Sequence, residues 1–191
     1  MKSFNTSFAS IALAVLVGSF PAAAAEPVLV DLTTSEGVIR LELDAEKAPQ
    51  TVANFVSYVE SGHYEGTVFH RVIAGFMVQG GGMDADLREK RTEPPIANEG
   101  GNGLKNLKYT IAMARTPDPN SATSQFFINT ANNGALDRAQ SQDGYGYAVF
   151  GKVILGNDVV DKIAAKKTGF KASMDDVPLE AITITTAKVI K

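Results

Sequence analysis

The stretch TVFHRVIAGFMVQGGG, residues 67–82, is the part of the chain that says most about the fold. β-Branched and aromatic residues dominate two runs, Thr67–Ile73 and Phe76–Gln79, and such runs are typical of strands. A break at Ala74–Gly75 separates the runs, and three glycines end the second one. We therefore expect two short strands joined by a turn.

One face of the first strand should carry a permanent positive charge. Successive side chains of a strand point to opposite faces, so Arg71 should share a face with Phe69 and Ile73. His70 should then point to the other face. On the second strand, the residues expected to share a face are Met77 and Gln79. The result is an apolar surface with one cation and one amide, without a nucleophile or an obvious general base.

Composition excludes several classes of protein. The 191 residues suffice for one good-sized domain, and no repeat or second domain is visible. A net charge of −3 without a basic run predicts no nucleic-acid partner. Because cysteine is absent, disulfides, thiolate nucleophiles and cysteine metal sites are excluded. The two histidines, His63 and His70, lack a suitable partner for a metal site, and we expect neither metal nor cofactor.

Residues 1–25 are expected to form a cleavable signal peptide. Lys2 gives a positive start, Ile11–Phe20 forms an apolar core, and small residues up to Ala25 suit a signal-peptidase cut. An N-terminal membrane anchor is the alternative, but the apolar run is shorter than the ~20 residues that a bilayer requires. We expect cleavage after Ala25, which leaves an exported domain of residues 26–191 without membrane contact.

Two helices are predicted in the exported domain. The first is Pro49–Ser61, where the apolar residues Val52, Phe55, Val56 and Val59 recur at helical spacing. Pro49 suits a first helical turn and Gly62 the position after the end. The second is Asn157–Lys167, with Asn157 or Asp158 as its N-cap.

The other regular segments read as strands. Val28–Ser35 and Val38–Asp44 alternate apolar and polar residues around a turn and predict a hairpin. Further expected strands are Lys108–Ala114, Gln125–Thr130, Tyr147–Val153 and Ala181–Val189, the last with Ile182 and Ile184 inward. Since helices and strands do not alternate, a parallel sheet is disfavoured, and a mainly β, closed antiparallel barrel with helical plugs is the expected architecture.

Each conspicuous residue also has a structural explanation. His70 is expected to be a hydrogen-bonded packing residue; a spatial Ser-His-Asp triad stays open, although no G-x-S-x-G motif is present. The three glycines suit a strand end better than a phosphate loop, because no Lys-Ser/Thr follows them. Arg71 could be an ordinary surface residue. Phe126 and Phe127 should face opposite sides of their strand, one toward the core and the other under a loop or into a groove.

Four blocks of sequence resemble the cyclophilin-type peptidyl-prolyl cis-trans isomerases. The blocks are FHRVIAGFMVQGGG, PPIANEGGNGLKN, YTIAMARTPDPNSATSQFFINTA and GYAVFGKVILGNDVVDKI, and the similarity spans Val28 to Lys188. The amino-acid sequences of these blocks are most similar to those of the exported bacterial branch, which implies a periplasmic location. The resemblance implies a closed eight-stranded antiparallel β-barrel capped by two α-helices, and an enzyme that isomerises the bond before proline in exported proteins.

The resemblance also implies a set of site residues. Arg71 is the implied catalytic residue. The implied substrate-binding residues are Phe76, Met77, Gln79, Ala114, Arg115, Thr116, Gln125, Phe127, Leu136 and Tyr147. The implied partners are proline-containing peptides and folding exported proteins. The acidic chain without large apolar patches favours a monomer. A non-catalytic peptide-binding chaperone module is the alternative, whereas a hydrolase has little support.

Two positions depart from the pattern of many eukaryotic members. Ala135 stands where those members have a tryptophan, so the groove should be wider there and cyclosporin binding weak. Tyr147 stands where they have a histidine, which alters the rim of the pocket. The loop Asp137–Gly146 is slightly longer than the corresponding loop of those members.

Overall fold

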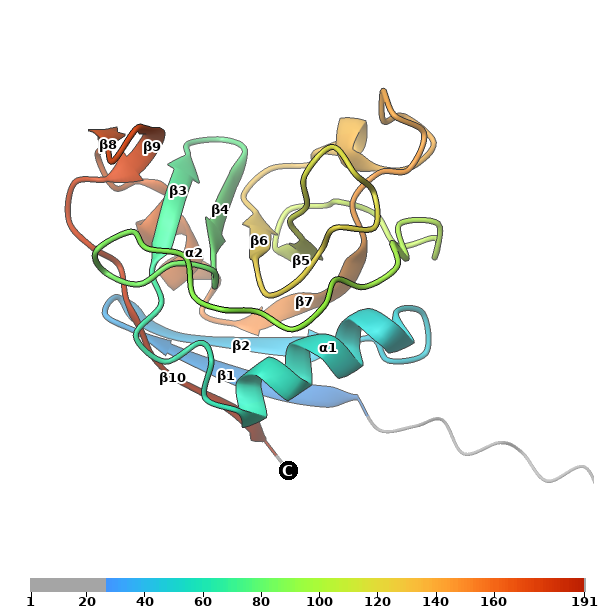
Figure 1. Ribbon diagram of the computed structural model, residues 1–191, viewed down its shortest axis with the longest axis horizontal. Helices are drawn as coiled ribbons and strands as arrows, with labels where there is room; N and C mark the ends of the chain where they lie inside the picture. The colour runs from blue at the N-terminus through green and yellow to red at the C-terminus, as the bar shows by residue number, and fades with distance from the viewer. Residues whose placement is uncertain (1–26, 191) are drawn as a thin grey trace, which may run out of the picture.

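The computed structural model describes residues 27–190, so the expected signal peptide and its cleavage site lie outside the described residues. One sheet of eight antiparallel strands dominates the structure (Figure 1). Its strands are β1 (Val28–Thr34), β2 (Gly37–Leu43), β3 (Phe69–Ile73), β4 (Met77–Gly80), β5 (Thr110–Met113), β6 (Phe126–Asn129), β7 (Val149–Leu155) and β10 (Ile184–Ile190). The remaining elements are the helices α1 (Pro49–Glu60) and α2 (Asn157–Ala164), the 3-10 turn η1 (Gly134–Leu136) and the hairpin strands β8 (Thr168–Lys171) and β9 (Met174–Pro178).

The sheet is an open half-barrel, and the expectation of a closed barrel was wrong. Its strand order is β10-β1-β2-β7-β5-β6-β4-β3, so β10 and β3 are the two ends. In the described part of the chain, the two ends are linked by an isolated bridge, Val68–Thr183, and by backbone bonds such as Phe69 N–H to the Ile182 carbonyl at 2.9 Å. This pairing stops where β3 begins, and β9 lies beside β3 instead (Figure 1).

The curled sheet and both helices enclose one apolar core. On α1, three of the four residues of the predicted stripe, Val52, Phe55 and Val59, are at most 4% exposed, and Val56 is partly buried against the core. The Phe55 ring lies 5.1–5.6 Å, centroid to centroid, from the rings of Tyr64, Phe126 and Phe150. Neither helix of residues 27–190 has the length and apolarity needed to cross a membrane.

The second helix begins differently from the prediction. Its N-cap is Gly156, at a φ of 87°, and neither Asn157 nor Asp158 caps it. A Cβ at this position would lie 2.2 Å from the Val38 carbonyl oxygen, so the close approach of β2 requires a glycine. The β8–β9 hairpin was not predicted at all, because its turn residues Ala172 and Ser173 take positive φ values without being glycine or asparagine.

Candidate functional site

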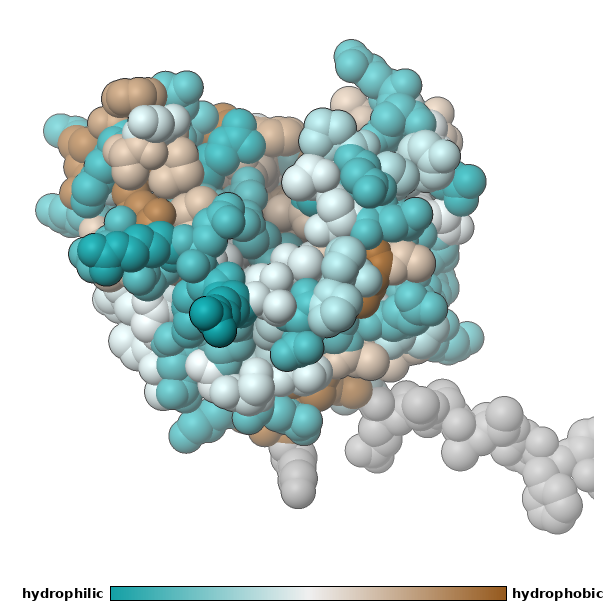
Figure 2. All heavy atoms as spheres, viewed as in Figure 1, coloured by the Kyte–Doolittle hydropathy of each residue, from teal (hydrophilic) through white to brown (hydrophobic). Residues whose placement is uncertain are grey.

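A groove on the outer face of the sheet brings together most of the residues that the sequence singles out. Its cavity of ≈170 Å³ is lined by Arg71, Phe76, Met77, Gln79, Ala114, Arg115, Phe127, Leu136 and Tyr147. In the space-filling view, a deep notch separates the lobe of β3, β4, β8 and β9 from the lobe of the loop that follows β6 (Figure 2). Segments far apart in the sequence therefore form one site.

Strand alternation explains the apolar floor of the groove. On β6, Phe126 and Ile128 enter the core, so Phe127 faces outward into the groove, where it is 4% exposed. On β4, Met77 and Gln79 share the groove face as predicted, while Val78 enters the core. The side chains of Met77, Ala112, Phe127 and Val149 form a second apolar cluster behind the groove.

Arg71 reaches the groove because of an irregularity in β3. The pairing with β4 runs from Phe69–Gly80 directly to Arg71–Gln79, which leaves His70 as an extra residue. The expectation that Arg71 and Phe69 share a face was therefore wrong. Phe69 enters the core, with its ring edge-on to Phe126 at 6.1 Å. The Arg71 side chain stays 46% exposed at the groove, with its Nε 3.9 Å from Oδ2 of Asp176 on β9.

The His70 side chain is buried inside the protein. It is 4% exposed, and its Nδ1 has no hydrogen-bond partner among the described residues. Burial is the main cause that lowers the pKa of His70 from 6.5 to about 4, and the nearby charge of Arg71 also contributes to the lowering. The imidazole is therefore neutral at physiological pH. No group of three or more potential metal ligands occurs among residues 27–190.

Thr116 and Gln125 lie in a second hollow next to the groove. This polar cavity of ≈270 Å³ shares Gln79, Ala114 and Arg115 with the groove. Gln79 Nε2 donates a hydrogen bond of 2.9 Å to Gln125 Oε1, which joins the walls of the two hollows. All eleven predicted site residues thus line one or other of two adjoining hollows.

Arg115 and Tyr147 form the wall between the hollows and the loop after β6. The Arg115 side chain is 4% exposed, and its guanidinium carbon lies 4.4 Å from the centre of the Tyr147 ring. The Tyr147 ring meets Phe127 edge-on at 5.7 Å. Asp143, which sequence reasoning missed, forms an ion pair with Arg115. On η1, Ala135 is exposed and leaves the rim beside Leu136 without a large side chain.

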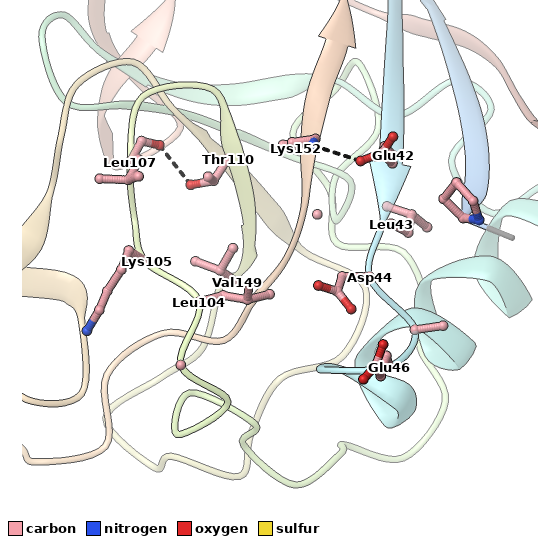
Figure 3. Close-up of a pocket in the computed structure, with 14 residues that line it drawn as sticks. Glu42, Leu43, Asp44, Glu46, Leu104, Lys105, Leu107, Thr110, Val149 and Lys152 are labelled. Carbon is pink, nitrogen blue, oxygen red and sulfur yellow. Dashed lines mark hydrogen bonds and ion pairs between the residues drawn. The ribbon is translucent and has the colours of Figure 1, made fainter. Parts of the chain in front are cut away.

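A larger cavity lies elsewhere in the described residues. It measures ≈460 Å³ and lies between the end of β2, the start of β7 and the loop before β5 (Figure 3). Its lining includes the apolar residues Leu43, Leu104 and Val149 and the ion pair of Lys152 with Glu42 at 2.8 Å. None of the eleven predicted site residues lines it. Its size alone does not make it the active site.

Comparison with known proteins agrees with the geometry. Residues 29–189 match the family described as cyclophilin type peptidyl-prolyl cis-trans isomerase/CLD. Peptidyl-prolyl cis-trans isomerase A of Dickeya dadantii is 56% identical over 160 residues, which are 84% of this chain and 83% of that protein. A peptidyl-prolyl cis-trans isomerase of Streptomyces antibioticus is 54% identical over 162 residues, 84% of this chain and 98% of that protein.

Solved structures give the same assignment. The crystal structure of a cyclophilin type isomerase of Cryptosporidium parvum matches with a TM-score of 0.66 and 26% identity, over 86% of this chain and 98% of that one. A structure of the same protein in the presence of the dipeptide Ala-Pro matches with a TM-score of 0.65 and 26% identity, over 85% of this chain and 99% of that one. The chain belongs to the cyclophilin-type peptidyl-prolyl cis-trans isomerases and has their isomerase activity.

Proposed function

We propose that the groove binds the residues on either side of a proline in exported proteins, and that Arg71 accelerates rotation about the bond that precedes the proline. The observation that carries this proposal is the arrangement of one cavity, where a guanidinium faces an apolar floor that includes Met77 and Phe127. An apolar cavity with the Arg71 guanidinium as a hydrogen-bond donor suits a proline ring next to a polar amide. The dipeptide Ala-Pro in a structure of the Cryptosporidium relative supports this choice of ligand.

The reaction needs neither an acid nor a base. Resonance gives the peptide C–N bond partial double-bond character, and rotation meets a barrier of ~18–20 kcal/mol. Uncatalysed exchange of an X–Pro bond takes roughly 10–100 s. No covalent bond forms or breaks, so a catalyst has only to favour the twisted amide over the planar one.

Arg71 can supply that preference. When the amide is twisted, the proline nitrogen becomes pyramidal and regains a lone pair that can accept a hydrogen bond. The Arg71 guanidinium is always protonated and presents five donors in a rigid fork. A bond to this nitrogen strengthens in the transition state, and only interactions of that kind lower the barrier.

The other groove residues would hold the peptide while one side of the bond turns. Phe76, Met77, Phe127 and Leu136 would enclose the proline ring, and removal of water there would strengthen the bond from Arg71. The linked amides of Gln79 and Gln125, and the backbone of Ala114, Arg115 and Thr116, would fix the other side of the peptide.

NMR titration of the labelled protein with an Ala-Pro peptide tests the location of this site. We expect the backbone signals of Gln79, Ala114 and Phe127 to shift because the peptide fills the groove. Signals of Leu43 and Leu107, which line the cavity of Figure 3, should stay in place. Shifts confined to the latter pair would contradict the proposal and assign the peptide to the larger cavity.

Export is a second part of the proposal, and it rests on the sequence of residues 1–25. In a bacterial host, cell fractionation should recover the mature protein from the periplasm, shortened by 25 residues at its N-terminus. A variant that lacks residues 1–25 should stay in the cytoplasm. Full-length protein held in the membrane fraction would show instead that the segment is an anchor.

A further inference from the structure

Leu136 and Tyr147, which both line the groove, also flank the two ends of one loop. The Tyr147 backbone N–H donates a hydrogen bond of 2.9 Å to the Leu136 carbonyl, which closes the loop of residues 137–146. Both side chains line the groove cavity. Any change in this hydrogen bond would therefore move two side chains that line the groove, where the proline ring is proposed to bind. We call this part of the groove the proline seat.

The buried side chain of Arg115 fastens the far side of this loop to the groove. Its Nε and Nη2 donate hydrogen bonds of 3.1 and 3.0 Å to the Gly146 carbonyl, and its Nη1 donates one of 3.1 Å to the Thr116 carbonyl. Nη2 also forms an ion pair with Oδ2 of Asp143. The guanidinium is thus bound within the protein, and its carbon lies over the Tyr147 ring, 4.4 Å from the ring centre.

Asp143 organises the loop itself. Its Oδ1 accepts backbone hydrogen bonds from Tyr145 at 2.9 Å and Gly146 at 3.2 Å, while its other oxygen faces Arg115. The bond from Tyr145 and the Arg115 guanidinium both lower the pKa of the Asp143 carboxyl, so the pair stays charged at neutral pH. One carboxylate therefore shapes the turn and sets the direction of the guanidinium.

These contacts form a continuous chain to the floor of the groove. Asp143 holds Arg115, Arg115 lies against the Tyr147 ring, and this ring meets Phe127 edge-on at 5.7 Å. We propose that Asp143 and the side chain of Arg115 are positioning residues of the isomerase, which fix Tyr147 and Leu136 as walls of the proline seat. The inference rests on the proposed function of the groove. It adds a role for Asp143 and for the Arg115 side chain, beyond the contact of the Arg115 backbone with the peptide.

A double-mutant cycle on kcat/KM tests the pair. Asp143→Asn removes the charge from the turn, and Arg115→Lys keeps a charge but loses the rigid fork. We expect each change to lower kcat/KM about tenfold, mainly through a higher KM because the seat is less well defined. The double variant should be no worse than the poorer single one, since both changes break the same link. Additive losses would show that the two residues act independently and would overturn the proposal.

A matched pair elsewhere in the protein controls for general stability. Arg40 and Asp31 form a two-bond ion pair of 2.6 and 2.8 Å between β1 and β2, and neither residue lines the groove. Asp31→Asn should therefore leave kcat/KM unchanged. A loss equal to that of Asp143→Asn would mean that any broken ion pair lowers activity, and the positioning role would be wrong.

The ring signals of Tyr147 give a readout that a merely stabilising residue would not move. In the free protein, Asp143→Asn should shift the Tyr147 and Phe127 ring resonances, while those of the core residues Phe55 and Tyr64 stay in place. Shifted rings with unchanged kcat/KM would overturn the role in catalysis. Full activity of an Arg71→Ala variant would instead overturn the proposed function of the groove, so the two failures are distinguishable.

Discussion

Two neighbouring basic residues of β3, His70 and Arg71, have opposite environments. His70 is 4% exposed inside the protein, whereas the Arg71 side chain is 46% exposed at the groove. The sequence predicted that the two side chains point in different directions, and this is confirmed. It could not predict that Phe69 enters the core, because nothing in the local residue pattern distinguishes a bulged strand from a regular one.

The buried imidazole of His70 should make the protein less stable in acid. Its pKa falls from 6.5 to about 4 on folding, so between these values the unfolded state binds a proton that the folded state excludes. Stability is fully present above pH 6.5 and is lost as the pH falls toward 4. The loss is about 3 kcal/mol of unfolding free energy. Urea unfolding at pH 7 and pH 4.5 measures most of this loss.

His70→Gln should remove this part of the pH dependence. His63→Gln is the comparison, because it leaves His70 in place and should keep the part of the pH dependence that His70 causes. The pKa of His63 is itself lowered, first by burial and then by the charge of Lys90, so this variant removes only the contribution of His63. If wild type and His70→Gln lost the same free energy between the two pH values, the imidazole would not be the cause.

At the scale of elements, sequence reasoning succeeds where a segment's own pattern decides its structure. The apolar stripe and Pro49 predicted α1 to within one residue, Pro49–Glu60 against the expected Pro49–Ser61. Sequence reasoning fails where a segment that is distant in the chain determines the local structure. The first turn of α1 is capped by the carboxylate of Glu99, which accepts from the backbone N–H of Gln50 and Thr51 at 3.1 and 2.8 Å.

The cap of α2 gives a prediction at this scale. Gly156→Ala should destabilise the protein by more than about 2 kcal/mol, because alanine pays for a positive φ and its Cβ would clash with the Val38 carbonyl. Gly66→Ala is the matched control, since Gly66 has a φ of 76° but nothing within 4 Å of a Cβ. It should cost only about 1–2 kcal/mol. Equal unfolding midpoints for the two variants would contradict the steric explanation.

At the scale of the whole molecule, the sequence predicted the mainly β architecture with two helices, but not the openness of the barrel. Closure depends on whether β3 and β10 pair along their length, and their residue patterns do not decide this. The resemblance supplied most of the site residues, because strand alternation alone pointed only to Arg71, Met77, Gln79 and one of two adjacent aromatic side chains. Asp143 and Asp176 were missed, since the first lies in an irregular loop and the second in a hairpin of unusual turn residues.

Exchange spectroscopy on an Ala-Pro peptide is the measurement that tests the central claim most directly. Two-dimensional NMR follows the cis and trans forms of the peptide with substoichiometric protein added. Wild-type protein should produce strong exchange peaks, and Arg71→Ala should abolish them while still binding the peptide. Arg88→Ala, at an exposed arginine outside the groove, should behave as wild type. Undiminished exchange with Arg71→Ala would contradict the mechanism, and binding without exchange by the wild type would make the groove a peptide receptor.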